Sequence, residues 1–361
     1  MISNKLWSFN ERFLPTRVLH GPQWLVLGVN NVCNLHCKMC DVGTETLNTN
    51  FAQNLVGTQP LNMPGDLLKT VIDQTANRWP NAKLGYAFTE PSIYPHLVDT
   101  LDYAQGNKLH TSLTTNGLNL RKISSDLSRA GLREIFISLD GPEEVHDVIR
   151  GHTGSFRRAV DGIESLLDCR SRAAISVFCV ITEWNTGRLK DFADFFARYP
   201  LAKLGFMHPN FTPDFVAQRH NARYGASYPA TESNVASTNF AKTDLDELWQ
   251  QMLQIRRAEY PFPISFSPEI HRREDLDAFY HRPETLVGKR CIDVFRNMMI
   301  KSDGTVIPAH GRCYNYPVGN VYKSELSAIW NSSAFARIRR DLNTAGGLFP
   351  ACSRCCSAFG G

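Results

Sequence analysis

The sequence has no long apolar run, no block of like charge and no repeated unit. No stretch reaches the roughly 18 apolar residues that a transmembrane helix needs. Residues 1–10 show no basic region followed by a long apolar one, so no signal peptide is predicted. The net charge is +4, and basic residues gather only in short clusters such as Arg256-Arg257 and Arg272-Arg273, which excludes a basic arm for nucleic acid. We therefore expect a cytoplasmic protein with neither a membrane nor a nucleic-acid partner.

Cysteines are plentiful, and most of them are grouped. Ten occur among the 361 residues; three lie within 33–40 and five within 291–356, whereas Cys169 and Cys179 stand alone. In a cytoplasmic chain, grouped cysteines indicate metal binding or catalysis more often than disulfides. With 43% apolar and 20% charged residues the chain can bury a large core, and its length predicts two domains.

Between the two cysteine groups, short apolar runs alternate with amphipathic stretches. The runs predict six strands, and most of them are followed by a stretch with helical spacing. The pattern predicts an α/β fold: a partial (β/α)6 TIM-type barrel, whose chemistry would lie at the carboxyl ends of its strands. The predicted strands are 24–29, 83–88, 110–114, 134–139, 174–181 and 202–207, and the predicted helices are 68–79, 92–104, 120–130, 156–167 and 189–198. Two long polar stretches, 41–65 and 210–243, are read either as lids or substrate walls or as simple solvated loops.

The first cysteine group has the spacing Cys-x3-Cys-x2-Cys, formed by Cys33, Cys37 and Cys40 directly after the first predicted strand. Thiolates are soft ligands suited to iron–sulfur clusters, and three of them can hold three corners of a [4Fe–4S] cube. The fourth iron would then be open to a small molecule. The alternatives are a zinc site with His36 as fourth ligand, or cysteines buried as small apolar side chains.

The triad resembles that of the radical S-adenosylmethionine (SAM) enzymes, and four further motifs follow in the order typical of that family over about residues 22–210. They are Phe88-Thr89-Glu90-Pro91 where the family usually has Gly-Gly-Glu-Pro, Thr114 to Gly117, Ile137 to Gly141 followed by Arg150 in a His-x3-Arg-Gly context, and Val180 to Asn185. The resemblance implies a SAM-binding [4Fe–4S] cluster on the triad. It also implies SAM contacts from Met39, Phe88, Thr89, Glu90, Asn116, Ser138, Asp140, Arg150 and Asn185.

By the same resemblance, the reduced cluster cleaves SAM to methionine and a 5′-deoxyadenosyl radical, which abstracts a substrate hydrogen. The protein would be an enzyme of the oxidoreductase or isomerase type that uses a flavodoxin- or ferredoxin-type electron donor. Its own contribution would be binding, orientation and exclusion of water.

The second cysteine group follows a predicted β-hairpin, in which apolar runs flank Asp303-Gly304. A helix is predicted from Leu326 to Leu342. The spacing Cys-x21-Cys-x38-Cys-x2-Cys suits zinc and iron–sulfur equally well when taken alone. Behind a radical SAM domain it resembles the SPASM/twitch extensions, which implies one auxiliary [4Fe–4S] cluster on Cys291, Cys313, Cys352 and Cys355.

Three side chains are candidates for catalysis: Cys179, His208 and Cys356. Cys179 on the fifth strand would quench a substrate radical or be a buried apolar residue. His208, just past the sixth strand, would bind substrate or be a structural histidine. Cys356 would replace Cys355 as a ligand, donate a hydrogen atom or play no part.

These expectations divide the chain into four parts: an N-terminal extension at 1–21, a radical SAM barrel at 22–210, a lid or linker with a helix at 211–290, and the auxiliary domain at 291–361. The leading hypothesis is dehydrogenation or epimerisation of a polar specialised metabolite such as a sugar or aminoglycoside, because only about 20 residues precede the first strand, too few for a leader-peptide module. The alternative is crosslinking or epimerisation of a ribosomal peptide or protein. A remote alternative is a non-catalytic metal-binding interaction protein.

Overall fold

A single ten-stranded sheet forms the centre of the molecule in the computed structural model, which describes residues 9–11 and 13–359. Its order is β10-β9-β8-β1-β2-β3-β4-β5-β6-β7, and every neighbouring pair from β8 to β7 is parallel. The strands are β1 Trp24–Leu27, β2 Lys83–Tyr86, β3 His110–Thr115, β4 Glu134–Ser138, β5 Ala174–Val180, β6 Lys203–Met207, β7 Ile264–Ser267, β8 Asn297–Ile300, β9 Thr305–Pro308 and β10 Gly319–Asn320. The six predicted strands are confirmed as β1 to β6, and the predicted α/β barrel-type fold is confirmed with them.

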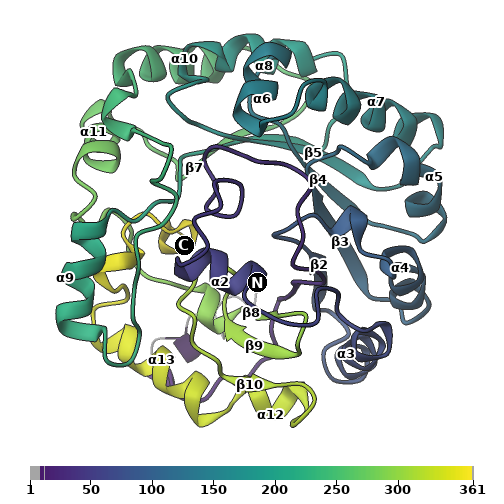
Figure 1. Ribbon diagram of the computed structural model, residues 1–361, viewed down its shortest axis with the longest axis vertical. Coiled ribbons are helices and arrows are strands. Elements are labelled where there is room, and N and C mark those ends of the chain that lie inside the picture. Colours follow the sequence, from purple (N-terminus) through teal and green to yellow (C-terminus); the bar gives the residue numbers. More distant parts are fainter. Residues whose placement is uncertain (1–8, 12, 360–361) are drawn as a thin grey trace.

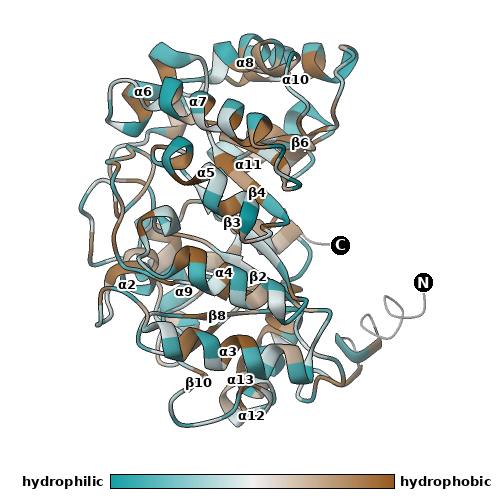
Figure 2. Cartoon of the chain, turned by 90° about the vertical axis from the view of Figure 1, so that its right-hand side faces the viewer, coloured by the Kyte–Doolittle hydropathy of each residue, from teal (hydrophilic) through white to brown (hydrophobic). Residues whose placement is uncertain are grey.

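Most helices surround the curved sheet on its outside, whereas α2 is seen inside the ring (Figure 1). The long helices combine hydrophobic and hydrophilic residues, as the colouring in Figure 2 shows. In α3 and α7 the buried residues are mostly apolar, as expected for helices that pack one face on a core. The helices are α2 Asn50–Val56, α3 Gly65–Arg78, α4 Leu97–Gly106, α5 Leu120–Arg129, α6 Glu143–Arg150, α7 Ser155–Asp168, α8 Leu189–Phe196, α9 Asp214–Tyr224, α10 Leu245–Arg257, α11 Arg273–His281, α12 Leu326–Trp330 and α13 Ser333–Thr344.

The C-terminal hairpin is part of the barrel sheet. Strands β8 and β9 pair antiparallel as predicted, with Gly304 at φ +77° in the turn between them. Strand β8 also pairs in parallel with β1, from Trp24 opposite Asn297 to Leu27 opposite Ile300. The carboxyl end of β8 therefore lies on the same rim as the cysteine loop that follows β1.

Two predictions of regular structure were wrong in detail. The single helix predicted from Leu326 to Leu342 is split into α12 and α13, because the side chain of Ser332 caps a new helix by accepting a hydrogen bond from the backbone N–H of Phe335. The polar stretches predicted as loops contain α2 and α9. Residues 1–8 and 12 of the predicted N-terminal extension, and residues 360–361, lie outside the described residues.

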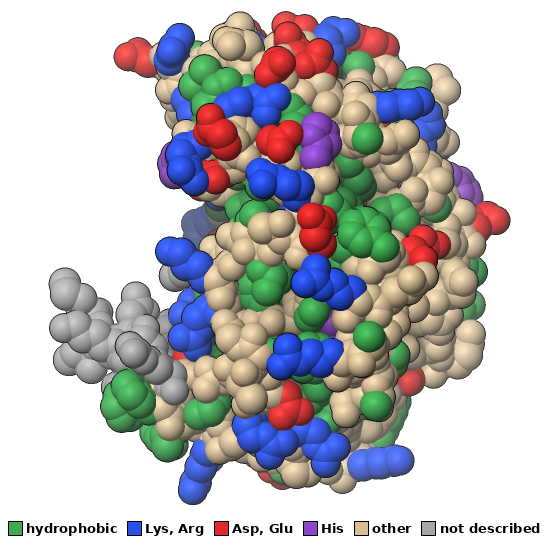
Figure 3. Space-filling model, turned by 90° about the vertical axis from the view of Figure 1, so that its left-hand side faces the viewer, with side chains coloured by type: hydrophobic (Ala, Val, Ile, Leu, Met, Phe, Trp, Pro, Cys, Tyr) green, Lys and Arg blue, Asp and Glu red, His purple; other side chains and the backbone are tan. Residues whose placement is uncertain are grey.

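The surface carries charges of both signs. On the face drawn in Figure 3, basic and acidic side chains lie among scattered apolar ones. Among the helices that the structure describes, none combines the length and the apolar character that a membrane span requires.

Candidate functional site

The N-terminal cysteine loop lies at the carboxyl rim of the sheet, directly beyond β1. Cys33, Cys37 and Cys40 pack with Met39 in one small apolar cluster. The loop is held in place by the backbone N–H of Lys38, which donates to the carbonyl of Ile149 at 2.9 Å. The structure thus brings the three predicted ligands together with the methionine that was predicted to contact SAM.

Burial disfavours the charged thiolate form of Cys33 and Cys37, so the thiolates require nearby positive charge. Desolvation raises the pKa of Cys37 to about 12 and also raises the pKa of Cys33. Among the described residues, a cation contacts Cys37: Nη1 of Arg150 lies 3.6 Å from its Sγ. A single guanidinium cannot balance three thiolates, so the loop fits a cationic metal cluster that binds the thiolates and supplies the remaining charge.

Arg150 forms a fully buried ion pair with Asp140. Its Nε lies 2.6 Å from Oδ2 of Asp140, which is completely buried. The carboxylate also accepts from the backbone N–H of Val180 at 2.8 Å, while the backbone N–H of Asp140 donates to Nδ1 of His146 at 3.0 Å. The pair therefore joins the ends of β4 and β5 to the cysteine loop.

The motif after β2 reaches toward both cysteine groups. Phe88 has φ +88°, a left-handed conformation that favours glycine. The resembled family usually has glycine at this position, which this conformation suits. The ring of Phe88 stacks on His310 at 5.9 Å between centroids. Thr89 donates from Oγ1 to the carbonyl of Asn30 at 2.7 Å. Backbone geometry suited to glycine is thus retained at Phe88 by a bulkier residue.

Glu90 is buried and accepts hydrogen bonds from the end of β3 and from its own turn. Its carboxylate accepts from Thr115 Oγ1 and from the backbone N–H of Asn116, each at 2.7 Å, and from the backbone N–H of Ser92 at 2.9 Å. Burial raises the pKa of Glu90, and these donors act in the opposite direction. The Asn116 amide in turn donates to Oδ1 of Asn34 in the cysteine loop at 2.7 Å.

Ser138 and Asn185 close the next two strand ends. Ser138 is the last residue of β4 and pairs with Phe178. The amide of Asn185 is buried and donates to the carbonyls of Val180 and Asp140 at 2.7 and 3.0 Å. The same amide lies 3.7 Å from Sγ of Cys179, which is fully buried.

His208 lies in an aromatic environment beyond β6. Its Nδ1 is 3.0 Å from the hydroxyl of Tyr280, and the ring of Phe279 lies 5.4 Å away. Desolvation lowers the pKa of His208 to about 3, so the imidazole is neutral at physiological pH. The geometry describes a buried, neutral histidine just beyond β6.

Four of the five C-terminal cysteines line one cavity of about 80 Å³. They are Cys291, Cys313, Cys352 and Cys355. Burial raises the pKa of Cys291, Cys313 and Cys352, while the hydrogen bond to Cys356, followed by burial, raises the pKa of Cys355. The thiol of Cys352 lies 3.3 Å from the hydroxyl of Tyr314. Four converging thiols around a cavity fit the donor set of an iron–sulfur cluster. Sequence analysis did not identify Tyr314 as a site residue, although it directly follows the predicted ligand Cys313.

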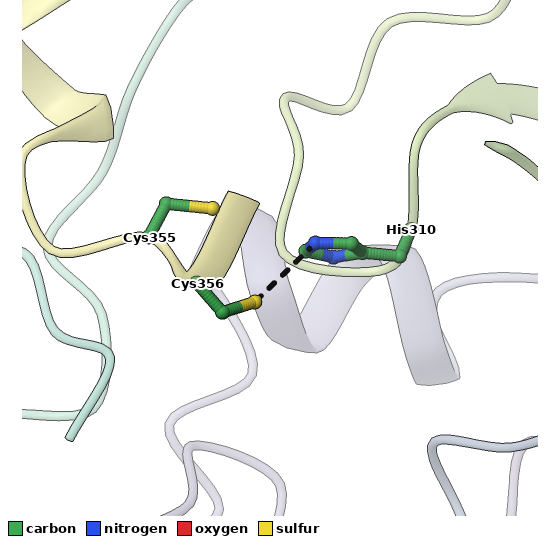
Figure 4. Close-up of side chains that lie close together, drawn as sticks. All are labelled: His310, Cys355 and Cys356. Atoms are coloured by element: carbon green, nitrogen blue, oxygen red, sulfur yellow. Dashed lines mark hydrogen bonds between the residues drawn. The ribbon is translucent and has the colours of Figure 1, made fainter. Parts of the chain in front are cut away.

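The thiol of Cys356 points toward His310 (Figure 4). Its Sγ lies 3.5 Å from Nε2 of His310, and that nitrogen is 2.7 Å from Oγ of Ser357. Ser357 donates to Asp293 at 2.5 Å. The ligand atoms of His310, Cys355 and Cys356 lie within 4.8 Å of one another, so His310 is close to both neighbouring thiols.

Asp41 is a further residue that sequence analysis missed. Its carboxylate is buried and accepts hydrogen bonds from Thr49 Oγ1 at 2.7 Å, Ser233 Oγ at 2.9 Å and the backbone N–H of Asn234 at 2.6 Å. Asp41 therefore joins the stretch after Cys40 to residues 229–234, which we call the strap. No motif in the sequence indicated this contact, since the two partners are almost two hundred residues apart.

Comparison with known families supports the assignment of both cysteine groups. A profile of the radical SAM superfamily matches residues 28–196, and the SPASM profile, described as an iron–sulfur cluster-binding domain, matches residues 291–356. Mycofactocin maturase MftC of Mycobacterium tuberculosis is 29% identical over 189 residues, which are 51% of this chain and 44% of that protein. The AdoMet-dependent heme synthase of Oleidesulfovibrio alaskensis is 30% identical over 38% of this chain and 33% of that protein. The chain thus matches less than half the length of either relative.

Solved structures share the fold. Streptococcus suis SuiB bound to its precursor peptide SuiA has a TM-score of 0.60 at 15% identity, covering 94% of this chain and 70% of that chain. The protein anSMEcpe with bound AdoMet and the Cp18Cys peptide has a TM-score of 0.60 at 16% identity, covering 94% of this chain and 89% of that chain. At these identities the likeness concerns the fold alone.

Proposed function

Because the chain belongs to the radical SAM superfamily and carries a SPASM iron–sulfur domain near its C-terminal end, we propose that it modifies a ribosomal peptide at a C–H bond, by crosslinking or epimerisation. The observation that carries the peptide substrate is the similarity to mycofactocin maturase. The fold shared with SuiB, whose structure contains a precursor peptide, agrees with it. These relatives favour a peptide over the sugar or aminoglycoside that the sequence first suggested.

In this proposal Cys33, Cys37 and Cys40 hold the SAM-binding [4Fe–4S] cluster. When bound, the cluster and SAM supply a 5′-deoxyadenosyl radical by one-electron cleavage of SAM. The chain's own task is positioning: Glu90 ties the ends of β2 and β3 together, and Arg150 holds its charge against Cys37 through Asp140. The residues proposed to contact SAM are Met39, Phe88, Thr89, Glu90, Asn116, Ser138, Asp140, Arg150 and Asn185.

The auxiliary cluster is assigned to Cys291, Cys313, Cys352 and Cys355, because these four line the cavity. Cys356 is proposed to be outside the ligand set, since Cys355 lines the cavity and Cys356 does not. With all four ligand positions filled by protein, such a cluster serves electron transfer. We expect a flavodoxin- or ferredoxin-type protein to supply electrons in the cell, and a chemical reductant replaces it in the assay.

The test uses anaerobically purified and reconstituted protein. We expect about eight irons per chain from two [4Fe–4S] clusters and 5′-deoxyadenosine formation from SAM with dithionite. In a short peptide encoded beside the gene we expect either the loss of two hydrogens, which reports a crosslink, or deuterium uptake from D2O at an α-carbon, which reports epimerisation. Replacing both Cys313 and Cys352 by alanine should abolish the peptide product while slow SAM cleavage continues. The exposed Cys169, replaced by alanine, is the control that should change neither.

Two results would contradict parts of this proposal. A cluster-loaded protein that cleaves no SAM in the presence of the peptide would contradict the radical chemistry. SAM cleavage that modifies a sugar or aminoglycoside, with the neighbouring peptides left unchanged, would return the substrate to the metabolite class.

A further inference from the structure

The cavity of the auxiliary site extends to the rim of the barrel. Its walls include Asn50 and Phe51 of α2, Asn210 after β6, and Thr231 and Ser233 of the strap. These rim residues are neutral, so no carboxylate lines the cavity in the part of the chain that the structure describes. The charged side chains in its lining are Arg312 and Arg354, together with His310.

The two arginines differ in how their hydrogen-bond donors are used. Arg354 is buried and donates to the carbonyls of Ala278, Phe279, Arg282, Ser353 and Thr285. Arg312 is half-buried, and its guanidinium makes one long contact, 3.5 Å from Nη1 to the carbonyl of Asn210. Within residues 9–11 and 13–359 it forms no ion pair. Most of the five N–H donors of Arg312 are therefore available to a ligand.

The guanidinium is held at the rim end of the cavity. It lies over the face of Phe51, 4.3 Å from the ring centroid, where stacking orients its plane. The backbone on either side of it is fixed by Asn54, whose amide donates to the carbonyls of Gly311 at 3.0 Å and Cys313 at 2.7 Å. A rigid backbone and a stacked side chain reduce the entropy lost on binding.

We propose that Arg312 is a specificity-determining residue that binds a carboxylate of the substrate at the mouth of the auxiliary cavity. A planar guanidinium with free donors matches a carboxylate in bidentate geometry, and the neutral rim offers no competing acid. The carboxylate is that of an Asp or Glu side chain or of a chain end. The substrate class follows from the proposed peptide function, on which this inference rests.

The test measures binding of three small probes to the reconstituted, SAM-bound enzyme by saturation-transfer NMR. N-acetylglutamate amide carries only a side-chain carboxylate, N-acetylalanine carries only a terminal one, and N-acetylglutamine amide carries neither. We expect at least one of the two carboxylate probes to bind and the uncharged probe not to. Arg312→Gln should weaken that binding about tenfold or more, as loss of a charge-assisted pair does, and Arg312→Lys should restore part of it. Arg158→Gln, at an exposed position on α7, should leave binding unchanged.

Several outcomes would overturn the inference. The first is equal binding of the charged and uncharged probes. The second is no binding of either carboxylate probe at roughly 20 mM, an upper limit for weak ligands. The third is unchanged binding of the probes in Arg312→Gln. If Arg312→Gln instead shifts the midpoint potential of the auxiliary cluster while probe binding stays the same, the arginine serves the cluster and not the substrate. Iron content and 5′-deoxyadenosine formation are measured on the same samples, so failure of the radical function is recognised separately.

Discussion

At the scale of single residues, Phe88 combines an unfavourable backbone with a useful side chain. Its φ of +88° favours glycine, while its ring contacts His310 and Phe51. Replacing it by glycine or by alanine removes the same ring contacts, but only alanine keeps a Cβ in the left-handed conformation, at a cost of about 1 kcal/mol. We therefore expect Phe88→Gly to be more stable than Phe88→Ala, with both below wild type. Urea unfolding measures the order, and an alanine variant as stable as the glycine variant would show that the backbone is not strained.

The pH dependence of stability tests the burial of His208. Its pKa in the folded protein is about 3, against about 6.5 when unfolded, so the unfolded state binds the additional proton. The contribution of neutral His208 to the free energy of unfolding is therefore fully present above about pH 6.5 and is lost as the pH falls toward 3. Between pH 7 and pH 5 this residue should cost roughly 2 kcal/mol.

The variant His208→Phe supplies the comparison, because it lacks the titrating group. As the pH falls, we expect the unfolding free energy of the wild type to decrease more than that of the variant. Other buried histidines and acid-labile clusters are common to both proteins, so the difference isolates His208. Parallel pH profiles would mean that the imidazole is hydrated or charged in the folded state.

The sequence predicted the metal-ligating cysteines better than it predicted the hydrogen bonds and ion pairs around them. Cysteine spacing within a short loop is local, and Cys33, Cys37 and Cys40 lie together as their spacing predicts. The pairing of Arg150 with Asp140 depends on a distance set by two strand ends and one helix, which no local pattern encodes. For the same reason the predicted SAM contact of Arg150 and the buried ion pair could not be distinguished from sequence.

At the scale of elements, Asp41 connects the stretch that carries α2 to the strap. Its carboxylate accepts three hydrogen bonds, two of them from Ser233 and Asn234. Asp41→Ala should leave those donors unpaired, at a cost of about 1–3 kcal/mol. Amide hydrogen exchange of Ser233 and Asn234 should accelerate by about ten- to a hundredfold. Ser233→Ala, which removes one bond only, should have the smaller effect, and equal protection in all three proteins would show that the strap is held by other contacts.

Regular alternation made the barrel elements predictable, whereas irregular elements were not. Strands β1 to β6 are short apolar runs between amphipathic helices, so periodicity located them. Strand β7 has the sequence Ile264-Ser265-Phe266-Ser267, too short and too polar to be distinguished from a loop. The break between α12 and α13 depends on one capping serine within an otherwise continuous helical pattern.

At the scale of the whole molecule, the C-terminal region completes the barrel sheet. Met298 and Ile300 of β8 are fully buried in the main core beside Leu25 and Leu27 of β1. A chain ending at residue 290 would expose the edge of β1 and the apolar surface beneath it. An exposed apolar strand edge promotes aggregation.

We therefore expect residues 1–290 alone to be insoluble or to lose cooperative unfolding, even though the superfamily profile ends at residue 196. Soluble yield and thermal unfolding by circular dichroism measure this. The full-length chain with Cys291, Cys313, Cys352 and Cys355 replaced by serine is the matched control, because it lacks the auxiliary ligands but keeps β8. If the control folds and the truncated chain does not, the sheet contact is what the barrel requires. If the truncated chain folds and unfolds cooperatively, the C-terminal region is an independent domain despite its strand pairing.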